Sequence, residues 1–181
     1  NAVYHHLGCP AEFVYRPVNR LDKDTSGLML VALNAHAQHL AQQALHTDDF
    51  IREYLAVVEG CPPQLQGVID LPMGKVDSAS IRREVRADGK PARTFYRVLK
   101  AGERRSLVRL RLDTGRTHQI RVHMQAMGCP VAGDFLYGTE LEALPGRFAL
   151  HSAHVKIRHP LTGRWLEYES SMPPELRTLL D

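Results

Sequence analysis

The strongest constraint on the fold is an alternation of polar and apolar residues through two consecutive stretches, residues 82–100 and 105–113. Alternation with a period of two places successive side chains on opposite faces of an extended strand. Asp88-Gly89 lies inside the first stretch, and Ala101-Gly102 separates the two. Dipeptides of this kind are typical of tight turns. The pattern therefore predicts antiparallel strands that follow one another along the chain.

Shorter segments around these strands complete the predicted architecture. The apolar run at residues 28–33 and the stretch at residues 54–58 predict two further strands. The spacing of apolar residues predicts a helix over residues 35–46, with Asn34 at its N-cap. Thr117 can cap a second, short helix. We therefore predict an α+β fold, with a mixed, mainly antiparallel sheet and short flanking helices.

Composition narrows the class of protein. A chain of 181 residues can bury one sizeable core, so we expect a single domain over residues 1–181. The longest apolar stretch has six residues, whereas a membrane helix needs roughly 20. Three widely spaced cysteines, Cys9, Cys61 and Cys129, indicate neither a disulfide framework nor a zinc site. We therefore expect a cytoplasmic protein with reduced thiols and no membrane segment.

Positive charge is concentrated in one part of the chain. Residues 93–123 hold nine Lys and Arg against two acidic residues, and eight of the nine are Arg. The planar guanidinium donates paired hydrogen bonds to phosphate and does not deprotonate. A solvated strand face would explain the same charges. The charge distribution is therefore compatible with nucleic-acid binding but does not establish it.

Two polar segments could carry chemistry. Residues 20–27 crowd charged and hydroxyl groups just before an apolar run, and Arg20 and Lys23 flank Asp22 there. Neighbouring cations favour an ionised carboxylate, which can act as a nucleophile, a base or an electrostatic partner. Residues 113–123 form a glycine turn that leads into a helix start, where backbone N–H groups favour anions. An ordinary structural turn would explain either segment equally well.

Taken together, these segments resemble the motifs of a known family. Residues 19–28, Asn-Arg-Leu-Asp-Lys-Asp-Thr-Ser-Gly-Leu, resemble the His-Arg-Leu-Asp-x-x-Thr-Ser-Gly motif of the RluA-type RNA pseudouridine synthases. Residues 115–123, Gly-Arg-Thr-His-Gln-Ile-Arg-Val-His, resemble the second signature of that family. Residues 52–60, Arg-Glu-Tyr-Leu-Ala-Val-Val-Glu-Gly, resemble its intervening tyrosine strand. The resemblance extends over about residues 17 to 175.

The resemblance implies isomerisation of uridines in ribosomal or transfer RNA to pseudouridine, by an enzyme with no cofactor and no metal. A monomer is our default expectation for the oligomeric state. It implies that Asp22 is the nucleophile and that Tyr54 stacks on the flipped uracil and takes part in proton transfer. Arg121 would pair with Asp22 and hold it ionised. These roles agree with general physics, because an enzyme that acts on a base must extrude it from the stack and hold it between apolar or aromatic surfaces.

We also expect substrate contacts, some implied by the resemblance and some by the arginines themselves. Arg20 would fill the space that the flipped base leaves in the RNA stack, and Ile120 or a nearby apolar residue would line the pocket for the base. Arg116 would contact a phosphate or carboxylate at the helix start. Arg109 and Arg111, on the arginine-rich strand, would position the RNA backbone without reading bases.

Two departures from the family pattern stand out. Asn19 occupies the position where the family usually has His. The chain begins at Asn1 and lacks the strand with an Asn-Lys-Pro element that precedes the first motif in the family, so we expect that its N-terminal part is absent.

The alternative function is an RNA-binding module without turnover. Only an enzyme would need Asp22, Tyr54 and Arg121 together.

Overall fold

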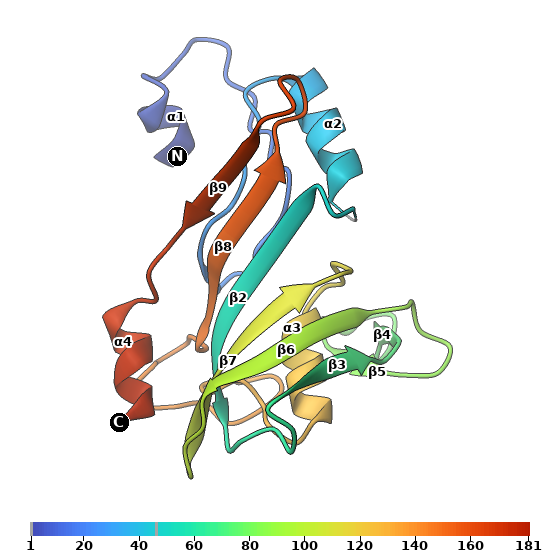
Figure 1. The fold of residues 1–181 in the computed structure, drawn as a ribbon, viewed down its shortest axis with the longest axis vertical. Coiled ribbons are helices and arrows are strands. Elements are labelled where there is room, and N and C mark those ends of the chain that lie inside the picture. The colour runs from blue at the N-terminus through green and yellow to red at the C-terminus, as the bar shows by residue number, and fades with distance from the viewer. Residues whose placement is uncertain (1, 46) are drawn as a thin grey trace.

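The computed structural model describes residues 2–45 and 47–181. Seven strands form one sheet in the order β1-β8-β2-β7-β6-β3, with β9 paired to β8, and β4 and β5 form a separate ribbon (Figure 1). The strands are β1 (Ser26–Gly27), β2 (Phe50–Glu59), β3 (Gln66–Asp70), β4 (Met73–Lys75), β5 (Arg83–Val85), β6 (Arg93–Lys100), β7 (Arg105–Leu112), β8 (Leu150–Arg158) and β9 (Trp165–Glu169). Within the described ranges β1 pairs with β8 in parallel and every other strand pair is antiparallel. The predicted α+β fold with a mainly antiparallel sheet is confirmed.

The helices are short and flank the sheet (Figure 1). They are α1 (Ala2–His6), α2 (Ala35–Ala44), α3 (Gln119–Ala126), α4 (Pro174–Arg177) and the 3-10 turn η1 (Thr178–Leu180). Asn34 caps α2 as predicted, because its side chain accepts a 2.8 Å hydrogen bond from the Ala37 N–H. The prediction that Thr117 caps the second helix is wrong. His118 occupies that position in a left-handed conformation with φ of 60°, and its side chain makes no capping bond.

The strand predictions at residues 54–58, 93–100 and 105–112 are correct. β6 and β7 form the predicted hairpin across Ala101-Gly102, and β2 contains the predicted strand. The turn at Asp88-Gly89 does not join two strands of the sheet, because β5 pairs with β4 instead of β6. The run at residues 28–33 is extended but forms no regular strand. Its backbone pairs with residues 16–19 at single points, as in the bonds from Val18 N to Leu30 O and from Ala32 N to Arg16 O.

Alternation along the central strands decides which face is buried. Tyr54 of β2 lies opposite Leu110 of β7, which lies opposite Tyr96 of β6, and all three side chains enter the main core. α3 lies against this face (Figure 1), and its Ile120 and Met124 side chains belong to the same core. Burial of these side chains ties the start of α3 to the middle of the sheet. The loop before α3 is therefore held beside β2.

Residues 2–45 and 47–181 contain neither a helix suited to cross a membrane nor a cluster of metal-binding side chains. No helix there is both long and apolar enough to cross a lipid bilayer. No group of three or more His, Cys, Asp or Glu side chains gathers in those ranges as a metal site would require.

Candidate active site

A cavity of about 250 Å³ lies where the two motif loops meet β2. Its lining contains five residues that the sequence analysis selected: Arg20, Asp22, Tyr54, Arg116 and Ile120. They come from segments far apart in the sequence, and the fold brings them together because β2 and α3 pack in the same core. The cavity is therefore the candidate active site.

Asp22 is held at the rim by its own loop. The Thr25 N–H donates a 2.9 Å bond to the Asp22 backbone carbonyl, which closes a turn. The chain then enters β1, where Gly27 has a φ of 103° and lies so close to Ser152 that a Cβ would overlap the Ser152 carbonyl. Only glycine meets both requirements. The Asp22 side chain keeps 28% of its surface exposed, so a substrate can reach the carboxylate.

Tyr54 is almost closed to solvent, with 5% of its surface exposed. Burial raises the pKa of its phenol, and the negative charge of Asp22 raises that pKa further, against the lowering effect of Arg52. The hydroxyl group therefore stays protonated at neutral pH. Tyr54 offers the cavity a ring surface and an O–H group, whereas it is a poor base.

Arg121 contacts Asp22, but more weakly than the sequence analysis expected. Its Nη1 lies 3.8 Å from Asp22 Oδ2, which is long for a hydrogen bond. Its Nε and Nη2 donate bonds of 2.6 and 2.7 Å to the two oxygens of Asp134, a residue that the sequence analysis did not single out. Both partners of this second pair are buried. Arg121 is therefore anchored by Asp134 and presents one edge to Asp22.

A neighbouring cavity of about 470 Å³ shares Asp22 with the first and is also lined by Arg121 and His118. The Nδ1 atom of His118 lies 2.7 Å from the Tyr137 hydroxyl. Burial lowers the pKa of His118 more than the nearby Asp22 carboxylate raises it. His118 is therefore neutral at neutral pH and is a hydrogen-bonding group between the two cavities.

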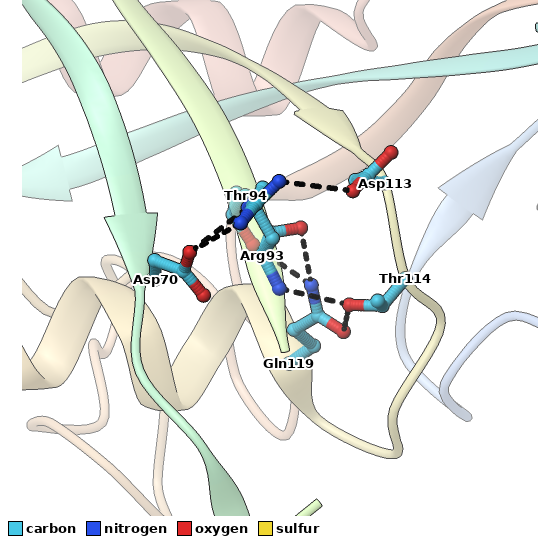
Figure 2. A network of polar contacts seen from close by, with 6 residues as sticks. All are labelled: Asp70, Arg93, Thr94, Asp113, Thr114 and Gln119. Atoms are coloured by element: carbon cyan, nitrogen blue, oxygen red, sulfur yellow. Dashed lines mark hydrogen bonds and ion pairs between the residues drawn. The ribbon is translucent and has the colours of Figure 1, made fainter. Parts of the chain in front are cut away.

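A polar network fixes the loop that carries Arg116 (Figure 2). The amide nitrogen of Gln119 donates to the carbonyl of Arg93 and to the hydroxyl of Thr94, at 2.9 and 3.0 Å. Its amide oxygen accepts from the hydroxyl of Thr114 and from the backbone N–H of Arg116, at 2.8 and 2.9 Å. Gln119 is buried, so these bonds have no competition from water. The network fastens the glycine turn to β6.

Arg93 ties the same network to the edge of the sheet. Its guanidinium donates bonds of 3.0 and 2.6 Å to Asp70 and lies 3.9 Å from Asp113. Figure 2 draws both contacts. These pairs are exposed and are each worth little in stability. Their geometric effect is to hold the ends of β3, β6 and β7 together below the turn.

Arg109 and Arg111 are not brought to the cavity. They alternate with Leu110, which faces the core, so both project from the opposite face of the sheet. Nη1 of Arg109 lies 3.7 Å from Glu53, and the guanidinium of Arg111 lies 4.6 Å from the centre of the Phe95 ring. Neither residue can contact a nucleotide in the cavity. A role for that face in binding more distant RNA stays a prediction.

Comparisons with known proteins agree with this geometry. A sequence profile of the family described as RNA pseudouridylate synthase matches residues 9–126. The chain is 42% identical over 163 residues to an uncharacterized RNA pseudouridine synthase of Bacillus subtilis, with 90% of this chain and 57% of that protein covered. It is 41% identical over 172 residues to the ribosomal large subunit pseudouridine synthase D of Nitrosomonas europaea, with 90% and 49% covered. The chain thus spans about half the length of these curated relatives.

Solved structures show the same relationship. The human protein called RNA pseudouridylate synthase domain containing 1 superposes with a TM-score of 0.74 and 30% identity, over 87% of this chain and 69% of that one. A second human protein, RNA pseudouridylate synthase domain containing 4, superposes with a TM-score of 0.77 at 23% identity and supports the fold alone. Sequence and structure thus agree, and the chain belongs to the RNA pseudouridylate synthase family.

Proposed function

We propose that this chain converts uridines in structured RNA to pseudouridine. The observation that carries the proposal is the convergence of Asp22 and Tyr54 on one cavity, with the Arg121 guanidinium 3.8 Å from the Asp22 carboxylate. A carboxylate, an aromatic platform and a buried cation are the groups that a cofactor-independent reaction on a flipped base requires.

The reaction is an isomerisation. The bond between N1 of uracil and C1′ of ribose breaks, the base turns over, and a bond forms between C5 and C1′. The hydrogen on C5 leaves as a proton, and N1 gains a proton. Asp22 is the group in the cavity that can attack the nucleotide or accept this proton. The protonated Tyr54 supports the ring of the base during the rotation.

The other cavity residues support binding of the target nucleotide. Arg20 is exposed at the rim, where its flat cation can stack in the gap that the extruded base leaves. Ile120 gives the cavity an apolar wall. Arg116 is exposed on the turn before α3, and its Nε is bonded to the Pro91 carbonyl at 3.0 Å, so its position is set before RNA arrives.

The substrate class we propose is ribosomal RNA, with transfer RNA as the alternative. The name of the Bacillus subtilis relative states no RNA class. The name of the Nitrosomonas europaea relative states the ribosomal large subunit. The identity of this chain to that relative, 41%, favours the ribosomal alternative. Both classes present uridines in loops where a base can be flipped at low cost.

Release of tritium from C5 tests the proposal directly. Ribosomal and transfer RNA transcripts labelled with tritium at uracil C5 are incubated with the protein, and label in water is counted. We expect release by the wild-type chain and no release by Asp22→Asn. Asp48→Asn is the matched control, because the Asp48 side chain is exposed and makes no ion pair with the residues that the structure describes.

The two outcomes that contradict the proposal are different. Equal release by wild type and Asp22→Asn would remove Asp22 from the reaction. Tight RNA binding without release by the wild type would favour the binding module. The transcript from which tritium is released, ribosomal or transfer RNA, identifies the RNA class.

A further inference from the structure

Arg52 lies in the candidate active site but has no part in the mechanism above. It stands on β2 two residues before Tyr54, so both side chains project from the same face of the strand. Both line the 250 Å³ cavity with Asp22. Only 5% of the Arg52 surface is exposed. A cation therefore lies almost fully desolvated beside the reacting groups.

No carboxylate neutralises Arg52 among the described residues. Its single hydrogen bond there runs from Nη2 to the Leu45 carbonyl at 3.4 Å, and its Nε–H has no acceptor. Its guanidinium carbon lies 5.4 Å from the centre of the Phe50 ring. Burial lowers the pKa of this guanidinium, with a smaller opposing effect from Tyr54. Arg121 is equally buried but holds Asp134 through two short bonds.

An unpaired buried charge is costly, because the protein does not replace the water that the charge has lost. A guanidinium cannot escape this cost by losing its proton at physiological pH. A folded chain can keep such a group where a ligand supplies the missing anion. The arrangement therefore points to a ligand with negative charge.

A second unpartnered donor borders the same cavity. Asn19 is 4% exposed, and its Oδ1 accepts a 2.9 Å bond from the Leu30 N–H, which fixes the orientation of the amide. Its Nδ2 is buried with no acceptor among the described residues. The buried hydroxyl of Thr25, another residue of the lining, also lacks a partner there. The unsatisfied groups of the lining can all donate hydrogen bonds, so an acceptor-rich ligand fits them.

We propose that Arg52, with Asn19, forms an anion subsite that takes a phosphate of the nucleotide whose base enters the cavity. This rests on the proposed function, since it assumes an RNA substrate. A uracil carbonyl would accept hydrogen bonds but would leave the charge of Arg52 uncompensated. A phosphate group supplies both the hydrogen-bond acceptors and the negative charge, and arginine matches phosphate in charge and geometry. The subsite anchors the nucleotide while the base turns.

Thermal melting with small nucleotides tests the subsite without the natural RNA. Melting temperatures are compared with uridine, uridine 5′-monophosphate, uridine 3′-monophosphate and inorganic phosphate at equal concentrations. We expect one monophosphate to raise the wild-type midpoint by more than uridine does, and the better one shows which phosphate is bound. Arg52→Met should abolish the difference between monophosphate and uridine, whereas Arg52→Lys should keep most of it.

The unliganded variant separates a binding role from a structural one. Arg52→Met removes an uncompensated charge, so its melting midpoint should equal or exceed that of the wild type. Its tritium release per enzyme at limiting RNA should fall at least tenfold, and the slope of log affinity for RNA against log salt should fall by about 0.7–0.9. Arg164→Met is the control, because Arg164 is exposed and does not belong to the lining.

Two results would overturn the subsite. A midpoint of Arg52→Met several degrees below wild type would assign Arg52 to the core. Equal wild-type responses to uridine and both monophosphates, including no response at all, would exclude a phosphate site. Absence of tritium release by the wild type would instead refute the proposed function, and the melting experiments would still decide whether the anion subsite exists.

Discussion

Substitution of Asp134 by Asn should destabilise the protein strongly, because it removes the charge that compensates Arg121. Asp134 is fully buried and Arg121 is 3% exposed. Asn keeps the Oδ1 atom that accepts from the Leu136 and Tyr137 N–H groups at 3.0 and 3.1 Å. It replaces the other oxygen by an NH₂ group, which faces a donor on Arg121. Breaking one side of a buried ion pair costs about 3–5 kcal/mol.

That free energy converts to a large shift in melting temperature. For a chain of this length, 1 kcal/mol corresponds to roughly 2–4 °C, so Asp134→Asn should lower the midpoint by about 6–20 °C. Asp22→Asn should behave differently, because Asp22 is 28% exposed and lies 3.8 Å from Arg121. Pairs of this kind contribute about 0.2–1 kcal/mol, so the midpoint should move by less than about 4 °C.

The assay is thermal unfolding of the two variants and the wild type in one buffer, with tritium release measured on the same samples below the lowest midpoint. Asp22→Asn should be stable and inactive, and Asp134→Asn should be unstable. A fall in midpoint for Asp22→Asn as large as that for Asp134→Asn would refute the reasoning. Arg121 would then depend on Asp22 for its compensation.

Three further outcomes are expected. Gly27→Ala should destabilise the chain by more than about 1 kcal/mol in denaturant titration, because its φ of 103° and the adjacent Ser152 carbonyl leave no room for a Cβ; an unchanged midpoint would contradict this. Burial lowers the pKa of His123, so the unfolded chain binds a proton below about pH 6.5 while the folded chain does not. The contribution of neutral His123 to the free energy of unfolding is therefore fully present above that pH and is lost as the pH falls. Between pH 7 and 5, the melting midpoint should fall less for His123→Gln than for the wild type. Arg116→Ala should lower the salt slope of RNA binding by about 0.7–0.9, whereas Arg109→Ala, beside Glu53 on the other face, should change it less; equal effects would place RNA on both faces.

Local sequence patterns were sufficient to predict the elements that bury one face and are set by residues close by in the sequence. The alternation around Leu110 predicts β7 and its buried face, and the Asn34 cap predicts the start of α2. Both depend on neighbours within a few residues. The run at residues 28–33 is apolar enough for a strand, but among the described residues its backbone pairs only with residues 16–19 and with Ser152. Whether residues 28–33 form a regular strand therefore depends on backbone partners elsewhere in the chain, which a local pattern does not reveal.

The same limit applies to the site. The motifs place Asp22, Tyr54 and Ile120 in one cavity, and the structure brings those residues together. The choice of Asp134 over Asp22 as the main partner of Arg121 depends on distances of 2.6 and 3.8 Å. A sequence contains both carboxylates but not these distances. The positive charge of residues 93–123 likewise does not reveal that Arg109 faces away from the cavity.

Arg52 and Arg121 show why partner choice matters more for function than residue type. Both are buried arginines, Arg52 in the lining of the 250 Å³ cavity and Arg121 in that of the neighbouring 470 Å³ cavity, and neither can lose its charge at physiological pH. The anion for Arg121 is Asp134, inside the chain, so its removal must cost stability. No anion for Arg52 lies among the described residues. Removal of this cation should therefore relieve the desolvation cost in the free protein and weaken binding of the anionic ligand. Unchanged or higher stability with a loss of activity is therefore the expected signature of a buried cation whose anion is supplied by the ligand.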